Sequence, residues 1–277
     1  MKTDDVKRVV REGYAKVAKG SGSCCGPQSS CCGTAPTAED VSRRVGYSDA
    51  ELAAAPEGAN LGLGCGNPVA LASLREGEVV LDLGSGAGFD CFLAAKKVGS
   101  RGRVIGVDMT PEMLEKAREN ARKTGVANVE FRLGEIENLP VADGSVDAVI
   151  SNCVINLAPD KARVFAEAFR ALKPGGRLMV SDLVLTAPLP KVVQESVAAY
   201  VGCLAGASLK DEYLRAIEQA GFEKIHVASE DSFPVDLMQN DPTAQAVVKD
   251  LKVSREEVTR IAGTVVSVKV SARKPDR

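Results

Sequence analysis

From Gly77 onward, short apolar runs alternate with helical stretches, and this alternation constrains the fold more than any other feature of the sequence. The alternation is typical of βαβ units, which build a parallel sheet with helices on both faces. The predicted strands are Val79–Leu83, Arg103–Val107, Val129–Leu133, Val146–Ser151 and Arg177–Leu185. The helices predicted between them are Gly88–Val98, Pro111–Thr124 and Asp160–Leu172. The sequence therefore predicts an α/β protein with a mostly parallel sheet.

The rest of the chain adds segments at both ends of this sheet. Further helices are predicted in residues 1–19, after Pro190 towards Cys203, and at Leu209–Ala220; further strands are predicted at Lys224–Ser229 and Thr264–Ala272. We expect the last strand to be antiparallel, because no helix follows it. Three segments result: 1–40 with a helix and a flexible Cys-rich loop, 41–230 as the core, and 231–277 as an insertion plus the final strand.

The charge balance argues against two classes of partner. The chain has 35 Lys and Arg against 37 Asp and Glu, a formal net charge of −2, which gives no general attraction to nucleic acid or to an anionic membrane. No stretch approaches the roughly 18 apolar residues of a membrane span, and the N-terminus has no apolar signal core. We therefore expect a cytoplasmic location.

A glycine-rich turn follows the first predicted strand, in the order Asp82-Leu-Gly-Ser-Gly-Ala-Gly88. Glycines at a strand-to-helix turn let the backbone approach a ligand closely, although turn glycines alone would also explain them. A dinucleotide fingerprint would need glycine at position 89, which is Phe89, so hydride transfer is disfavoured. Asp108 ends the second strand, where a carboxylate can accept the hydroxyl groups of a ribose.

Three further motifs occur in a fixed order after this turn: Gly134-Glu-Ile-Glu-Asn-Leu-Pro140, Asp143-Gly-Ser-Val-Asp147 and Leu172-Lys-Pro-Gly-Gly176. Together with the glycine turn they resemble the class I S-adenosylmethionine-dependent methyltransferases, whose fold is Rossmann-like. The resemblance implies S-adenosylmethionine as cofactor, with Asp108 at its ribose. The other cofactor-binding residues that it implies are Asp82, Gly84, Ser85, Gly86, Gly88, Met109, Glu135, Ile136 and Asn152.

Eight cysteines are the second unusual feature of the chain. Four lie within nine residues, Cys24, Cys25, Cys31 and Cys32, and the others are Cys65, Cys91, Cys153 and Cys203. A zinc motif is not supported, because there is no C-x-x-C pair and the single histidine, His226, falls in a predicted strand. Cys91 falls on a helix, and we expect it in the core. Cys65, Cys153 and Cys203 fall in loops or at a strand end, where three thiols could meet at the cofactor face.

Trivalent arsenic suits three thiolates beside a methyl donor, because it keeps a lone pair that can attack the methyl group. Its methylation needs no general base, which fits a chain with one histidine. Two other readings stay open: a class I methyltransferase that acts on a small organic molecule, with structural thiols, and a non-catalytic thiol protein that binds a soft metal.

A closer resemblance rests on three strings: Asp82-Leu-Gly-Ser-Gly-Ala-Gly-Phe-Asp-Cys91, Ser151-Asn-Cys-Val-Ile-Asn-Leu-Ala-Pro-Asp-Lys161 and Gly202-Cys-Leu-Ala-Gly-Ala207. With Gly106-Val-Asp-Met-Thr110 they resemble the arsenite methyltransferases over about residues 40–230. The resemblance implies that Cys65, Cys153 and Cys203 hold trivalent arsenic, presented as arsenite or its thiol complexes.

The family resemblance also implies a redox role for one N-terminal thiol. A further cysteine pairs with the equivalent of Cys65 to reduce arsenic after methyl transfer, and we assign this role to Cys32, with Cys31 as the next choice. Thioredoxin or glutathione would then reduce the disulfide. Cys24, Cys25 and Cys31 are either capture thiols or part of a flexible redox tail. The expected process is arsenic detoxification.

Overall fold

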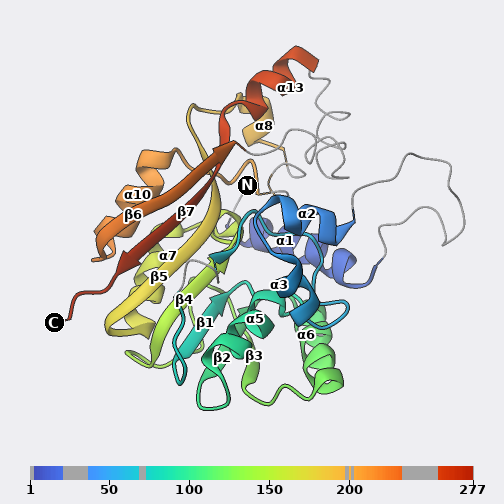
Figure 1. Ribbon diagram of the computed structural model, residues 1–277. Coiled ribbons are helices and arrows are strands. Elements are labelled where there is room, and N and C mark those ends of the chain that lie inside the picture. The colour runs from blue at the N-terminus through green and yellow to red at the C-terminus, as the bar shows by residue number, and fades with distance from the viewer. Residues whose placement is uncertain are drawn as a thin grey trace, which may run out of the picture.

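A seven-stranded sheet forms the centre of the protein (Figure 1). The computed structural model describes residues 3–20, 37–68, 73–196, 200, 203–232 and 255–276. The strands are β1 (Val79–Leu83), β2 (Arg103–Asp108), β3 (Val129–Leu133), β4 (Val146–Asn152), β5 (Leu172–Leu185), β6 (Glu223–Ser232) and β7 (Val265–Arg273). Their order is β3-β2-β1-β4-β5-β7-β6, and β7 runs antiparallel to both of its neighbours. The predicted mostly parallel sheet with an antiparallel last strand is confirmed.

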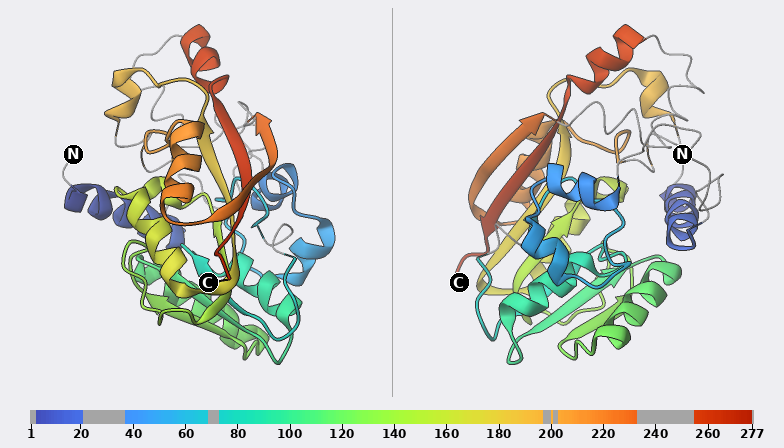
Figure 2. Two further views of the ribbon diagram at one scale, coloured as in Figure 1. Left: turned by 90° about the vertical axis from the view of Figure 1, so that its left-hand side faces the viewer. Right: turned by 45° about the vertical axis from the view of Figure 1, so that its right-hand side comes forward.

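Helices cover both faces of the sheet, as predicted (Figure 2). The helices around the sheet are α5 (Phe89–Val98), α6 (Pro111–Thr124), α7 (Lys161–Ala171) and α10 (Lys210–Gln219). The others are α1 (Thr3–Ala18), α2 (Ala38–Arg44), α3 (Asp49–Ala54), the 3₁₀ turn η1 (Ile155–Leu157), α8 (Lys191–Gln194) and α13 (Arg255–Ala262). In the described part of the chain, none of the helices has the length and hydropathy needed to cross a membrane.

Alternate residues of the strands fill two separate cores. From β1, Val80 packs with α5 and α6, whereas Leu81 and Leu83 point to the opposite face and pack with α7 and α10. All three side chains are fully buried, because parallel strands are covered on both sides. This burial supplies the main stabilising contribution, at about 25 cal/mol for each Å² of apolar surface removed from water.

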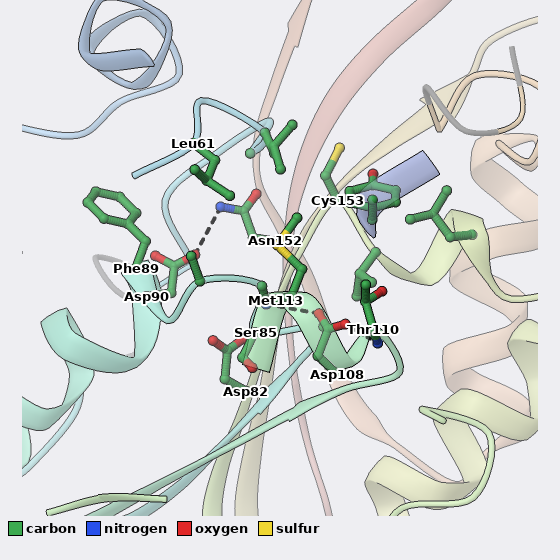
Figure 3. Close-up of a pocket in the computed structure, with 18 of the residues that line it drawn as sticks. Leu61, Asp82, Ser85, Phe89, Asp90, Asp108, Thr110, Met113, Asn152 and Cys153 are labelled. Carbon is green, nitrogen blue, oxygen red and sulfur yellow. Dashed lines mark hydrogen bonds between the residues drawn. The ribbon is translucent and has the colours of Figure 1, made fainter. Parts of the chain in front are cut away.

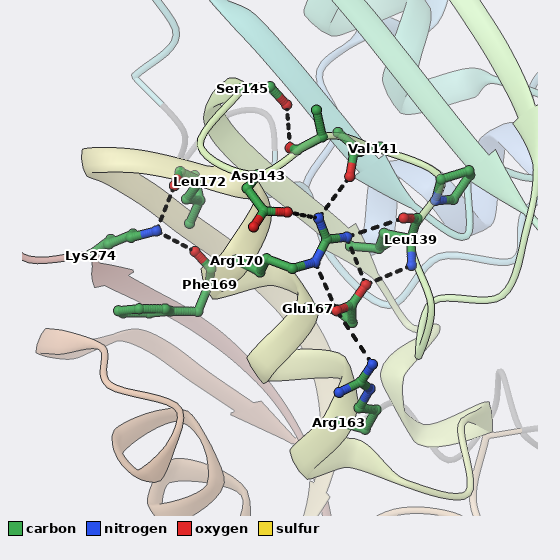
Figure 4. A network of polar contacts seen from close by, with 12 residues as sticks. Leu139, Val141, Asp143, Ser145, Arg163, Glu167, Phe169, Arg170, Leu172 and Lys274 are labelled. Atoms are coloured by element: carbon green, nitrogen blue, oxygen red, sulfur yellow. Dashed lines mark hydrogen bonds and ion pairs between the residues drawn. The ribbon is translucent and has the colours of Figure 1, made fainter.

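A network centred on Arg170 of α7 holds the segment that leads into β4 (Figure 4). The guanidinium donates to the Glu167 and Asp143 carboxylates and to the carbonyls of Leu139 and Val141. Glu167 in turn accepts a bond from the peptide N–H of Leu139 at 2.8 Å. The network fixes the chain that follows the Gly134 motif, and so fixes one side of the ligand-binding edge of the sheet.

Strand β5 is longer than the sequence predicts. β5 begins at Leu172 instead of Arg177, because Leu172 pairs with Val146 before a register shift that the Pro174-Gly175-Gly176 segment accommodates. Gly175 adopts a left-handed conformation, with φ at +73°, and its N–H donates to the carbonyl of Lys274. The turn thus depends on the chain that follows β7, which the local sequence pattern does not reveal.

Candidate active site

A pocket opens at the carboxyl ends of β1, β2 and β4, where open α/β sheets bind ligands (Figure 3). Helix α1 covers one side of it. Most of the residues predicted to bind the cofactor line this pocket: Asp82, Gly84, Ser85, Gly86, Asp108, Met109, Ile136 and Asn152. Gly88 is the residue directly before α5, next to this lining, and Glu135 lies at the rim of the pocket. The fold therefore gathers the predicted set at one end of the sheet.

The glycine turn has the conformation that its residues predict. Gly84, Gly86 and Gly88 all have positive φ, a region that side chains rarely adopt. A Cβ atom on Gly84 would lie 2.2 Å from a methyl carbon of Val154, so the close approach of these two segments also requires glycine. The turn is therefore built to bring main-chain atoms into the pocket.

Asp108 ties the glycine turn to the end of β2. Its carboxylate accepts bonds from the N–H of Gly86 at 2.9 Å and from the N–H of Thr110 at 2.8 Å. Burial raises the pKa of Asp108, and these bonds oppose the rise because they stabilise the charged form. The carboxylate also lines the pocket, so it faces any ligand bound there.

Two further side chains that the sequence reasoning missed join the pocket wall. Tyr47 donates to one oxygen of Asp90 at 2.7 Å, and Asn152 donates to the other at 3.1 Å. Burial raises the pKa of Asp90 to about 6 and, together with the Asp90 charge, raises that of Asp82 well above its usual value. Asp90 is therefore mostly ionised at neutral pH and places negative charge beside the pocket, whereas burial favours the neutral form of Asp82. Asp90 follows the glycine turn and could have been suspected, but Tyr47 has no local sequence signal.

Helix α1 contributes Lys7, Val10 and Tyr14 to the pocket lining. The spacing of three and four residues puts these side chains on one helical face. Lys7 forms ion pairs with Glu135 at 2.7 Å and with Glu137 at 3.1 Å. Glu135 is thus placed at the rim by its partner on α1, whereas the neighbouring Ile136 and Glu137 line the pocket.

Three thiols meet at one end of the pocket. The ligand atoms of Cys65, Cys153 and Asp182 all lie within 4.8 Å of one another. The Cys203 sulfur lies outside this group, but its side chain packs with Cys65 and Cys153 in the same buried cluster. Cys203 Sγ also donates to the main-chain carbonyl of Cys153 at 3.0 Å. Cys153 lines the pocket, and all three cysteines are buried. The structure therefore brings together the three dispersed cysteines that the sequence singled out.

Two of these cysteines have an uncommon backbone. Cys153 has φ at +58° and Cys203 at +63°, in the left-handed region that non-glycine residues seldom occupy. Such strain persists only where the surrounding structure enforces it, and it concentrates at functional sites. Burial raises the pKa of Cys65, and the bond from Cys153 together with burial raises that of Cys203, so the free site holds neutral thiols.

Asp182 is a third residue that the sequence reasoning missed. It lies in β5, its side chain is buried, and its carboxylate accepts bonds from Asn156 at 2.8 Å and from Tyr213 at 3.1 Å. Burial raises its pKa to about 7, so much of it is protonated at neutral pH. The sequence feature that could have revealed Asp182 is a charged residue type within the mostly apolar run Leu178–Leu185.

The remaining cysteines and the histidine have other positions. Cys91 is fully buried on α5 and donates to Asp82 at 3.2 Å, in agreement with the expected core position. His226 lies on β6, as the strand prediction placed it. Cys32 and the other three N-terminal cysteines, Cys24, Cys25 and Cys31, lie outside the described residues.

Comparisons with known proteins agree with this geometry. Residues 74–221 match the family described as a methyltransferase domain. The chain is 47% identical over 281 residues to arsenite methyltransferase from Halobacterium salinarum, covering 99% of this chain and 68% of that one. It is 45% identical over 166 residues to arsenite methyltransferase from Aquipseudomonas alcaligenes, covering 57% of this chain and 47% of that one. A solved arsenic (III) S-adenosylmethionine methyltransferase from Chlamydomonas reinhardtii superposes with a TM-score of 0.61 at 34% identity, over 85% of this chain and 73% of the other.

Proposed function

Because the chain belongs to the arsenite methyltransferase family, we propose that it transfers a methyl group from S-adenosylmethionine to trivalent arsenic bound by its own thiols. One observation carries the proposal: Cys153 lines the cofactor pocket and also belongs to the buried thiol cluster with Cys65 and Cys203. A substrate held by these thiols would therefore adjoin the methyl donor. Holding two reactants side by side in this way supplies a large part of a rate enhancement.

The pocket has groups that suit S-adenosylmethionine. The Ser85 hydroxyl is buried without a hydrogen-bond partner in the described part of the chain, and the Asp108 carboxylate lines the pocket where ribose hydroxyls would donate to it. Met113 and Ile136 offer apolar surface for an adenine ring. The Asp82 and Asp90 carboxyls suit a cofactor with a cationic amine and sulfonium. When bound, the cofactor supplies an electrophilic methyl group.

The reaction that binds arsenite to three thiols balances in atoms and charge without an external acid or base. Arsenite, As(OH)₃, and three neutral thiols give a tris-thiolate complex and three water molecules, each thiol proton leaving with a hydroxide. A glutathione complex would exchange in the same way, releasing one glutathione thiol for each cysteine. The raised pKa values of Cys65 and Cys203 favour neutral thiols before binding, and the complex that forms is neutral as well. A neutral complex suits a buried site.

Methyl transfer uses the arsenic lone pair and formally oxidises arsenic to the pentavalent state, so two electrons must return. We propose that the Cys32 thiol attacks the arsenic-bound sulfur of Cys65: the sulfur–sulfur bond forms, the Cys65–arsenic bond breaks with its electron pair left on arsenic, and the Cys32 proton is released, which restores trivalent arsenic held by two thiolates. Thioredoxin or glutathione would then reduce the disulfide in a reducing cytoplasm. Cys65 is therefore assigned two successive roles, as ligand and as reductant.

The direct test incubates the full chain with arsenite, S-adenosylmethionine and glutathione and measures arsenic speciation over time. We expect methylated arsenic from the wild type and a loss of at least tenfold in Cys153→Ser, because serine cannot replace a thiolate ligand. Cys91→Ser is the matched control, since it also replaces a buried cysteine but lies outside the thiol cluster. It should keep the activity at a temperature where it remains folded.

Calorimetry with S-adenosylmethionine separates the alternatives. Cofactor binding without any methylated arsenic would contradict arsenite as substrate and favour a small organic acceptor. No cofactor binding at all would favour a soft-metal-binding protein and overturn both methyltransferase readings.

A further inference from the structure

Two side chains from distant strands hold the backbone of the Cys65 loop. Asn152 of β4 accepts a bond from the N–H of Cys65 at 3.0 Å and donates to the carbonyl of Gly66 at 2.9 Å. Ser267 of β7 donates to the carbonyl of Cys65 at 2.7 Å. Three main-chain polar groups of this loop are thus bound by side chains: the N–H and carbonyl of Cys65 and the carbonyl of Gly66.

The glycines beside Cys65 let the loop press against the sheet. A Cβ atom on Gly64 would lie 2.5 Å from the Asn152 amide nitrogen, and one on Gly66 would lie 1.6 Å from the Ser181 hydroxyl oxygen. Both distances are shorter than any real contact of that kind. The main chain of the loop therefore packs directly against the side chains of Asn152, Ser181 and Ser267.

Cys65 needs this support more than Cys153 does. Its loop lies between α3 and β1 and has neither helical nor strand structure at residues 64–66. Cys153, in contrast, directly follows β4, and its N–H donates to the carbonyl of Ser181 at 2.8 Å. The distance between the Cys65 and Cys153 sulfurs thus depends on how firmly side chains hold the loop.

We propose that Ser267, together with Asn152, positions Cys65 so that it can serve as the third thiol of the arsenic site. This inference rests on the proposed function and adds the C-terminal strand to the site. Ser267 is not one of the residues that line the cofactor pocket, and its hydroxyl donates to the Cys65 backbone. It is a positioning residue, and its loss should affect a ligand that needs three thiols more than one that needs two.

Two arsenic compounds can distinguish binding by three thiols from binding by two. Arsenite has three exchangeable bonds and can take all three thiols, whereas phenylarsine oxide keeps its carbon–arsenic bond and takes two. We would measure binding of both by calorimetry, without cofactor, in full-length chain with Cys24, Cys25, Cys31 and Cys32 replaced by serine. This background removes the N-terminal thiols from the measurement.

Ser267→Val and Ser267→Thr form the matched pair of variants. Valine and threonine have nearly the same shape and both suit a strand, but only threonine keeps a hydroxyl donor. We expect Ser267→Val to weaken arsenite binding about tenfold and phenylarsine oxide binding by less than about twofold, with Ser267→Thr close to the parent. Arsenic X-ray absorption should show three sulfur ligands in the parent and two in Ser267→Val. Ser271→Ala, four residues along β7, is a control for the strand itself.

Three results would decide against the inference. Equal weakening of both arsenicals in Ser267→Val would show a general structural effect. Equal affinities of the valine and threonine variants for arsenite would show that the hydroxyl has no positioning role. Three sulfur ligands in Ser267→Val would show that Cys65 needs no hydroxyl support. If the parent itself binds arsenite with fewer than three sulfurs, or the unsubstituted chain does not methylate it, the proposed function fails instead.

Discussion

Lys7 of α1 and Glu135, just after β3, form an ion pair across the rim of the pocket, with 2.7 Å between Nζ and Oε2. Lys7 also reaches Glu137 at 3.1 Å, and its own side chain is only 14% exposed. The pair links the N-terminal helix to the segment that follows the Gly134 motif. Helix α1 is thereby held as one wall of the cofactor pocket.

Replacement of Lys7 should weaken cofactor binding. In Lys7→Met the helix keeps its apolar contacts but loses both ion pairs, and we expect S-adenosylmethionine to bind about threefold to tenfold more weakly, since partly buried pairs contribute about 1 kcal/mol. Calorimetry measures the effect. Arg11→Met, an exposed position on the same helix, is the control and should bind normally. Equal affinities of the two variants would show that the ion pairs do not hold the pocket wall.

Asp108→Asn should loosen the glycine turn. The variant keeps the size of the side chain, but its amide group cannot accept both of the N–H bonds from Gly86 and Thr110. We expect about tenfold weaker cofactor binding and a loss of about 1–2 kcal/mol in the free energy of unfolding. Asp143→Asn, at an exposed site that pairs with Arg170, serves as the matched control. Normal cofactor affinity in Asp108→Asn would contradict the role of the carboxylate.

Cofactor binding should strengthen as the pH rises through about 6. Burial raises the pKa of Asp90 to about 6, so the group is neutral below this value and negatively charged above it. S-adenosylmethionine has a net positive charge, and an ionised carboxylate in the pocket wall attracts it. Titrations about one unit below and one above this pKa should show several-fold tighter binding at the higher pH.

The Asp90→Asn variant should bind with little dependence on pH in this range. Asp49→Asn, at a position whose side chain is 84% exposed, should keep the wild-type dependence. A wild-type affinity that falls with rising pH would mean that another group controls binding.

Gly66→Ala should displace the Cys65 loop and reduce arsenite methylation by more than tenfold. The new methyl group would overlap the Ser181 hydroxyl, and overpacking of this kind costs about 1–3 kcal/mol. Ser181→Gly removes the overlapping atoms, so the double variant should recover much of the activity. Gly263→Ala, where the added carbon would meet only ordinary contacts of 3.5 Å, is the control. Failure of the double variant to improve on Gly66→Ala would argue against a purely steric cause.

Most strands of the core could be predicted from local hydropathy. The β1 segment is a short apolar run that is buried, as expected of a central parallel strand, and β3 at the edge of the sheet alternates apolar and charged residues. Val79–Leu83 and Val129–Leu133 agree residue for residue with β1 and β3. The predicted start of β5 at Arg177 was wrong, because Leu172 already joins the sheet through its pairing with Val146. Local hydropathy cannot reveal a pairing partner that lies elsewhere in the chain.

Some residues of the candidate site could likewise be predicted from the sequence, and others could not. The glycine turn and Asp108 are adjacent to strand ends, and the order of the motifs along the chain was enough to suggest a methyl donor. Tyr47 and Ser267 have no such local signal, because one reaches Asp90 from an early loop and the other reaches Cys65 from the last strand. Their roles depend on contacts between segments that are 43 and 202 residues apart.

The sequence by itself determined the alternation of strands and helices, the glycine turn and the set of thiols, because these depend on residue type and local spacing. Only the tertiary structure decided that Cys65, Cys153 and Cys203 share one buried cluster, that α1 forms a pocket wall, and that Ser267 is hydrogen-bonded to the Cys65 carbonyl. The physical reason is that a hydrogen bond or a shared ligand site requires atoms within a few ångströms, and packing of the sheet brings these residues together across long sequence separations.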